Sequence, residues 1–281
     1  MKWKCITLGV VLAGASAVAP AKADQLDNIM SSKTLRCATF ADVPPFAAPD
    51  PATREMVGFD VDLCKAIAGA MGVTAEVKPV SVEARVPEVK LGRVDITVAN
   101  LAYTLGRAEQ IDFSDPYYLA KEMLIVPAAD EIGLGKTKAD FVGVRIASAK
   151  GSTSELSIKL NKSEPLTFQD TASAYLAVQQ GKARGMVANT MTTTKLVNES
   201  KTRGKEMRMI EEPMLFQPIG IGMPKGQPAL VAKVNVVLHK LDADGEINKI
   251  WEKWLGKDTE YKMTRTDKVV PLTELKFDPI P

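Results

Sequence analysis

Strand-like and helix-like segments alternate along most of this chain, and this alternation most narrows the folds open to it. A first series of strand, helix, strand, helix and strand patterns covers residues 34–39, 60–71, 74–80, 84–91 and 94–99. The helical pattern 60–71 places its apolar residues largely on one face and stops at Gly72, as helices commonly do. Strands that alternate with helices predict an α/β fold with a largely parallel sheet.

A second series of the same kind follows the first. Its strand patterns cover 143–149, 185–188 and 206–210, and its helical patterns cover 154–161, 171–180 and 191–200. A final helical region covers 229–242 and 246–255. Two short apolar segments, 123–128 and 219–223, lie between the series, and we interpret them as two crossings between two lobes, with the final helices returning to the first lobe. The cleft between such lobes is a common place for a ligand.

The N-terminus has the pattern of a secretory signal peptide. A basic start precedes an apolar run over 5–19, and Ala21-Lys22-Ala23 is a cleavage signal, so we expect cleavage after Ala23 and a periplasmic protein. The alternative, a membrane anchor, needs about 20 apolar residues, which this run does not reach. With 1–23 as signal peptide, we expect a first lobe over 24–125, a second over 126–222, and a return to the first over 223–281.

Composition excludes several classes of function. Without the three lysines of residues 1–23, the 36 Lys and Arg fall to 33 against 34 Asp and Glu, so a basic nucleic-acid-binding surface is not expected. A single histidine argues against a His-rich metal site or a Ser-His-Asp triad, and we expect no metal and no cofactor. In an exported protein Cys37 and Cys64 either form one disulfide or remain two buried thiols, and the sequence leaves both open.

A set of motifs resembles the family 3 bacterial extracellular solute-binding proteins, the receptors of polar amino-acid ABC transporters. The central motif is Gly-Phe-Asp-Val-Asp-Leu at 58–63. Others, in the family's order, are Pro-Pro-Phe at 44–46, Gly-Arg-Val-Asp at 92–95, Thr-Leu-Gly-Arg at 104–107, Asp-Phe-Ser-Asp-Pro-Tyr-Tyr at 112–118, Gly-Ser-Thr at 151–153 and the helix at 245–254. The resemblance covers essentially the whole mature chain.

The resemblance implies a type II periplasmic-binding-protein clamshell that closes around one small molecule and docks on a membrane permease, without catalysis and as a monomer. Arg107 matches the arginine that grips the ligand carboxylate, a task suited to a planar guanidinium. Ser152 and Thr153, after Gly151, match the loop of the second lobe whose amides and hydroxyls meet the same anion. Ordinary helix capping is the alternative role for this loop.

Several positions depart from the family's pattern for binding an α-ammonium group. Phe40 stands where many members have Asp, Val43 where they have an aromatic residue, and Ala102 where they have Ser or Thr. Asn189 replaces the aspartate of the second lobe that pairs with the ammonium, and Asn100 replaces Gly or Ser. A buried ammonium without a counter-charge costs several kcal/mol. Either another acid reaches the ligand or the ligand lacks the ammonium, and the pattern slightly favours the second.

Arg85 is a further candidate for the ligand site. It lies in Ala84-Arg85-Val86-Pro87, where acidic-amino-acid receptors of the family can carry an arginine for a second carboxylate. Val82 and Phe40 would then form apolar walls. These residues fit an anionic small molecule with a modest apolar part, whereas an ordinary amino acid remains the family's expectation.

An enzyme is the competing class, because the same clamshell occurs in secreted dehydratases that resemble cyclohexadienyl dehydratase. That reaction needs a general acid beside the arginine, and Phe40, Ala102 and Asn189 offer none, although Asp170 or Glu212 stays open. A receptor's sensor domain would need a membrane-spanning segment, and the sequence shows none. We therefore expect a binding protein and not an enzyme.

Overall fold

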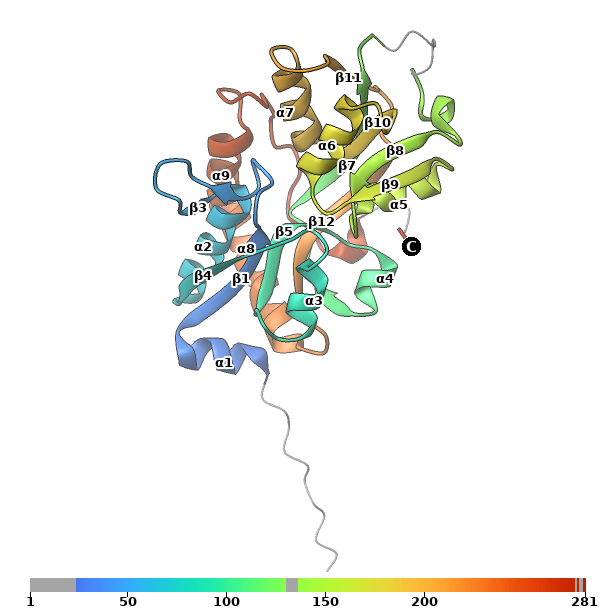
Figure 1. Cartoon of the computed structure of the whole chain (residues 1–281). Coiled ribbons are helices and arrows are strands. Elements are labelled where there is room, and N and C mark those ends of the chain that lie inside the picture. Colours follow the sequence, from blue (N-terminus) through green and yellow to red (C-terminus); the bar gives the residue numbers. More distant parts are fainter. Residues whose placement is uncertain (1–23, 130–135, 276, 278–279) are drawn as a thin grey trace, which may run out of the picture.

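The computed structural model describes residues 24–129, 136–275, 277 and 280–281 (Figure 1). The signal peptide expected over 1–23 lies outside the described residues. The main sheet has the strand order β4-β1-β5-β12-β7-β10-β8-β9. Helices pack against its strands in both lobes. In the described ranges, no helix is long and apolar enough to cross a membrane.

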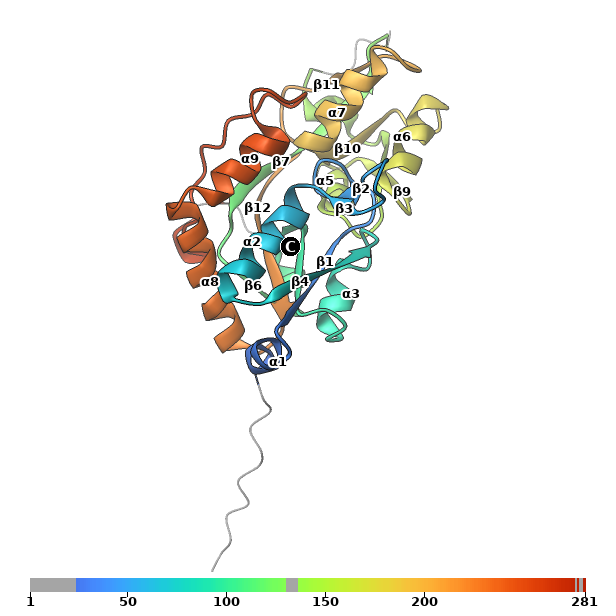
Figure 2. The ribbon, with the colours of Figure 1, turned by 90° about the vertical axis from the view of Figure 1, so that its left-hand side faces the viewer.

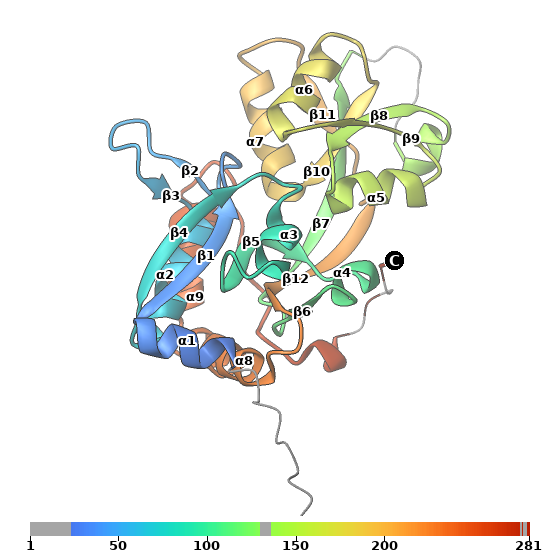
Figure 3. The same cartoon turned by 60° about the horizontal axis from the view of Figure 1, so that its bottom comes forward.

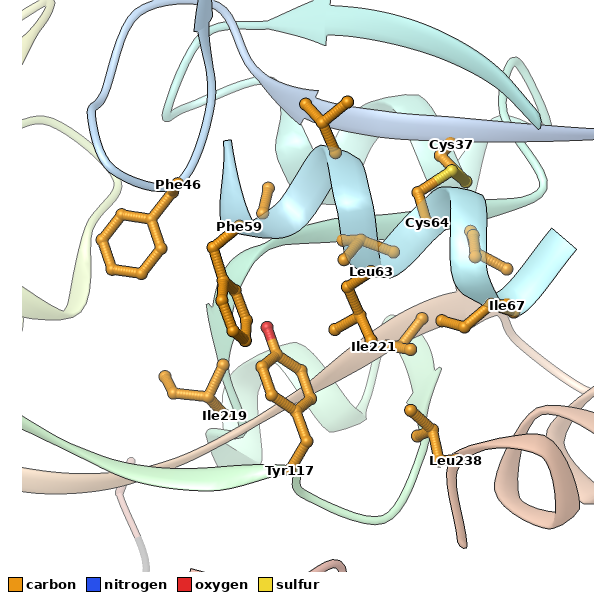
Figure 4. Packing of buried hydrophobic residues seen from close by; sticks show 14 of the residues in the cluster. Cys37, Phe46, Phe59, Leu63, Cys64, Ile67, Tyr117, Ile219, Ile221 and Leu238 are labelled. Carbon is orange, nitrogen blue, oxygen red and sulfur yellow. A yellow bond between two sulfur atoms is a disulfide. The ribbon is translucent and has the colours of Figure 1, made fainter. Parts of the chain in front are cut away.

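The first lobe is built on the parallel strands β4 (Thr74–Val80), β1 (Thr34–Phe40) and β5 (Ile96–Ala102). Its helices are α1 (Gln25–Ser32), α2 (Phe59–Met71), α3 (Arg85–Lys90) and α4 (Leu105–Ala108). The helix α2 packs against β1, and Cys37 of β1 forms a disulfide with Cys64 of α2 (Figure 4). The pairing that the sequence left open is therefore a disulfide.

The second lobe continues the same sheet. Its strands are β10 (Gly185–Asn189), β8 (Arg145–Ala149) and β9 (Glu164–Phe168), which run parallel to one another, and the short β11 (Met207–Met209). Three helices pack on them, α5 (Thr153–Leu160), α6 (Thr171–Gln179) and α7 (Thr190–Ser200). Separate apolar clusters fill this lobe, one around Phe141 and one around Met186.

Two long strands connect the lobes, β7 (Tyr118–Pro127) and β12 (Leu215–Pro224) (Figure 3). They are antiparallel neighbours, with 215–219 opposite 118–122. The crossing expected at 219–223 lies in β12, and the one expected at 123–128 lies in β7 except for its last residue. After β12, α8 (Pro228–Ala243) and α9 (Glu246–Leu255) pack on α2 (Figure 2).

Some elements differ from the expectation. The strand expected over 94–99 begins and ends later, at 96–102, because β12 pairs with it and places Ile219 opposite Ala102. The sequence analysis missed β9, whose residues are only partly buried and include Pro165. It also missed α1, α4 and the short strands β2 (Ala48–Pro49), β3 (Met56–Val57) and β6 (Ile111–Phe113). Short elements at the edge of a fold carry little apolar periodicity.

Candidate functional site

A cavity of about 50 Å³ lies between the two lobes. Most of the predicted site residues line it, namely Phe40, Val82, Arg85, Asn100, Ser152, Thr153 and Asn189, together with Val43. Pockets for small molecules commonly measure about 300–1,000 Å³. The lobes are therefore closed around a cavity that is small for a metabolite. Entry of a ligand therefore requires the lobes or the lining side chains to move.

Arg85, in the first turn of α3, is the buried cation of this cavity. Its Nε donates to the carbonyl of Val82 at 2.8 Å, and its Nη1 donates to the carbonyls of Ala99 at 3.0 Å and Asn100 at 3.3 Å. The guanidinium lies over the ring of Phe40, 4.9 Å from its centre, a favourable cation–π geometry. Burial, together with Arg107, lowers the pKa of Arg85 to about 9, so Arg85 still carries its charge at neutral pH.

Two asparagines meet across the cavity. Asn189 is the N-cap of α7, and its Oδ1 accepts a hydrogen bond from the amide of Met191 at 3.0 Å. This cap directs its Nδ2 toward Oδ1 of Asn100 in the first lobe, at 3.5 Å. The hydroxyl of Tyr118 donates to the same Oδ1 of Asn100. Amide groups from both lobes are thus placed to bind polar atoms, and in this closed arrangement they contact each other.

The loop before α5 acts as a helix cap. The hydroxyl of Ser152 accepts from the amide of Glu155 at 3.2 Å and donates to the carbonyl of Ala149 at 2.6 Å. The hydroxyl of Thr153 donates to Glu122 at 3.2 Å. The capping role that the sequence allowed is therefore present, and both hydroxyls have partners inside the protein.

Glu122 is an acidic group of the cavity that the sequence analysis missed. It lies on β7, only 2% of it is exposed, and its carboxylate lines the cavity. The carboxylate accepts from Thr153 at 3.2 Å, from the hydroxyl of Ser154 at 2.6 Å and from Nε2 of Gln217 at 2.5 Å. Burial raises the pKa of Glu122, although these three donors and Arg85 oppose the rise.

A signal for Glu122 was present in the sequence. The pair Lys121-Glu122 directly precedes the apolar run 123–128 that we interpreted as a crossing, and β7 begins earlier than that run. Glu122 places an acid in the cavity, as the first of the two alternatives for the ammonium group requires. Asp170 and Glu212, which the sequence left open as a general acid for the enzyme alternative, do not line the cavity.

Arg107 and Ala102 do not line this cavity. The Nη1 of Arg107 donates to the carbonyl of Ala102 at 2.8 Å, and its Nη2 donates to the carbonyl of Gly151 in the second lobe at 3.2 Å. Arg107 instead lines an adjacent cavity of about 260 Å³ together with Arg85 and Gly151. Burial lowers the pKa of Arg107 to about 10. In this structure the guanidinium bridges the lobes through two backbone carbonyls, next to the place where the resemblance puts the ligand.

Comparison with known families decides what kind of protein carries this site. Residues 35–257 match the model of the bacterial extracellular solute-binding proteins, family 3. The chain belongs to this family. The resemblance drawn from the motifs is therefore confirmed.

Relatives of known name support the membership. The glutamine-binding protein GlnH of an ABC transporter in Bacillus subtilis (strain 168) is 30% identical over 246 residues, which cover 84% of this chain and 86% of the relative. A solved ancestral arginine-binding protein with bound arginine is 32% identical with a TM-score of 0.72, over 80% of this chain and 99% of that one.

A further solved structure bears on the enzyme alternative. It is the ancestral amino acid-binding protein AncCDT-1, described as a precursor of cyclohexadienyl dehydratase, with 31% identity and a TM-score of 0.74 over 83% of this chain and all of that one. These structures share the type II clamshell, and the predicted fold class is confirmed. The curated relatives are named as binding proteins of transporters. In the described ranges, no cluster of three or more His, Cys, Asp or Glu side chains is arranged to hold a metal ion.

Proposed function

We propose that this family member is the periplasmic receptor of an ABC importer, captures an amino acid or a related small carboxylate between its lobes, and delivers it to a membrane permease as a monomer. The observation that carries the proposal is the closed cavity with charged groups of both signs, Arg85 and Glu122, at the junction of two lobes. Relatives named as glutamine-binding and arginine-binding proteins of ABC transporters agree with it. Cleavage after Ala23 would give a mature protein that begins at Asp24, which N-terminal sequencing of the exported protein tests.

Lobe closure supplies the mechanism. Arg107 and Arg85 belong to the first lobe, whereas Gly151 and Asn189 belong to the second, so only the closed arrangement brings these groups together. A ligand that contacts both lobes binds the closed state better and shifts the population toward it. The hinge strands β7 and β12 would absorb the movement, and the closed form would be the one that the permease recognises.

A dehydratase is the second candidate function, and Glu122 is the observation that favours it. A buried carboxyl group whose pKa is raised is what a general acid requires. Against this role, three hydrogen-bond donors surround its oxygens and favour the ionised form over the protonated one. We propose that the protein is not an enzyme. Formation of an aromatic product from prephenate or arogenate by the purified protein would overturn this.

A melting-shift panel tests the receptor function. Residues 24–281 would be purified through partial unfolding to strip carried-over ligand, and each amino acid would be paired with its amine-free carboxylate analogue. A ligand at 100 times its dissociation constant stabilises by about 2.7 kcal/mol. We expect the shift to be lost in Arg107→Ala and kept in Arg203→Ala, which alters an exposed arginine of the second lobe. A panel without any shift would contradict the proposal.

A further inference from the structure

Glu122 lies on the hinge strand β7, which pairs with β10 on one side and with β12 on the other. Across one pair of strands it lies opposite Asn189 of β10, and across the other it lies opposite Leu215 of β12. Residues directly opposite in an antiparallel pair project to the same face of the sheet. The carboxylate therefore lies beside Asn189, on the face that lines the cavity.

The hydrogen-bond inventory of Glu122 is incomplete. An ionised carboxylate has about four acceptor positions, and three neutral donors, Thr153, Ser154 and Gln217, use three of them. No ion pair to Glu122 is found in the part of the chain that the structure describes. A buried carboxylate without a cation is costly, so the remaining position calls for a positively charged donor from the cavity.

The opposite wall of the cavity carries the complementary charge. The Nε and Nη1 atoms of Arg85 are used by backbone carbonyls, and within the described ranges its Nη2 has no hydrogen-bond partner. The apolar residues Phe40 and Val82 lie on the same side. A small molecule held here meets an anion from the hinge and a cation from the first lobe.

We propose that the carboxylate of Glu122 binds the ammonium group of an amino-acid ligand, the task for which Asn189 carries no charge. This inference rests on the proposed receptor function and assigns one residue of its site. It replaces the slight preference for an amine-free acid, because that preference assumed that no acid reaches the ligand. Glu122 supplies that acid from the hinge, one strand away from Asn189.

A charge-removal variant tests the assignment. Calorimetric titration would compare an amino acid with its amine-free analogue on the wild type, on Glu122→Gln and on Glu76→Gln, which changes an exposed glutamate of β4. Charge-assisted hydrogen bonds correspond to a loss of roughly 10- to 100-fold in affinity. We expect that loss for the amino acid in Glu122→Gln alone, with the affinity for the analogue kept or improved. An equal loss for both ligands would assign Glu122 a purely structural role and overturn the inference.

A rescue variant keeps the test decisive if Glu122→Gln folds poorly. The double variant Glu122→Gln/Asn189→Asp moves the carboxylate to the opposite position on β10, and aspartate remains a good N-cap for α7. We expect it to recover most of the affinity for the amino acid. Failure of the rescue in a protein with normal melting behaviour would count against the charge role of Glu122.

The protons released when the ligand binds supply a second readout. Glu122 faces Arg85, Arg107 and Tyr118 through space, and Thr153, Ser154 and Gln217 through hydrogen bonds. A ligand ammonium favours the ionised form of Glu122, so over the pH range in which this carboxyl group titrates, binding should release protons and the affinity for the amino acid should rise with pH. Titrations in buffers of different ionisation enthalpy measure this release, which should vanish in Glu122→Gln. Proton uptake by the wild type would overturn the inference.

The two proposals fail in different ways. If neither amino acids nor carboxylates bind the wild type, the receptor function fails. If amine-free acids bind as tightly as their amino acids, the receptor function stands and the ammonium site at Glu122 is wrong.

Discussion

At the scale of single residues, Asp60 stands out beside the site. It lies in the first turn of α2, it is fully buried, and in the described structure neither of its oxygens has a hydrogen-bond partner. The hydroxyl of Tyr117, also buried, lacks a partner too. Burial raises the pKa of Asp60 to about 8, although the nearby backbone of Asn100 and the charge of Arg85 lower it in part. The folded protein therefore keeps this proton over a pH range in which the unfolded chain has lost it.

This proton should make the free energy of unfolding depend on pH. An unfolded aspartate titrates near pH 4, so between about pH 4 and about pH 8 the folded state holds more protons and the contribution of Asp60 to stability falls as pH rises. In Asp60→Asn this contribution is absent. We expect the free energy of unfolding of the variant, relative to wild type, to increase from pH 5 to pH 8 in urea titrations. A pH-independent difference would contradict the assignment.

At the scale of secondary-structure elements, the disulfide between Cys37 and Cys64 fastens β1 to α2. The two residues are 27 apart in sequence, and both are fully buried in the core of the first lobe (Figure 4). A bridge of this span limits the unfolded chain much more than the folded one. It supports the strand that ends at Phe40, a wall of the cavity.

Removal of the bridge should destabilise the first lobe without removing the site. For a loop of this length the loss is about 3.5 kcal/mol. We expect Cys37→Ala/Cys64→Ala to lower the free energy of unfolding by about that amount in denaturant titrations, with ligand affinity little changed. A reductant should lower the stability of wild type and leave the variant unaffected. Equal stability of the two oxidised proteins would contradict the role of the bridge.

At the scale of the whole molecule, a set of polar contacts joins the two lobes within the described ranges. They include the hydrogen bonds of Arg107 to Gly151 and of Asn189 to Asn100, and the ion pair of Lys150 with Glu83 at 2.9 Å. Both side chains of the ion pair are more than half exposed, and such pairs contribute about 0–1 kcal/mol. Ligand contacts can therefore outweigh these interactions and set the balance between open and closed forms.

Solution scattering measures that balance. We expect the stripped protein to have a larger radius of gyration than the protein saturated with a ligand from the panel, because the ligand adds contacts only in the closed state. Lys150→Ala should change both values little, since its ion pair is exposed. Identical radii with and without a bound ligand would show that binding does not close the lobes.

The sequence by itself determined the two α/β series, the two crossings and the membership in the family, because periodicity and short motifs are local properties. The helix caps at Gly72 and Ser152 are local as well. Each depends on residues that are close along the chain, so no distance between lobes was needed to predict it. The same holds for the signal peptide, which stays a prediction.

Only the tertiary structure decided which groups meet in the cavity. Cys37 and Cys64 pair because β1 lies against α2, and Glu122 lies beside Asn189 because β7 pairs with β10 in one particular register. Arg107 turns to the carbonyls of Ala102 and Gly151 because the second lobe closes over it. Each of these contacts joins residues far apart in sequence. The sequence supplies the chemical groups of these side chains, whereas strand register and lobe closure set the distances between them.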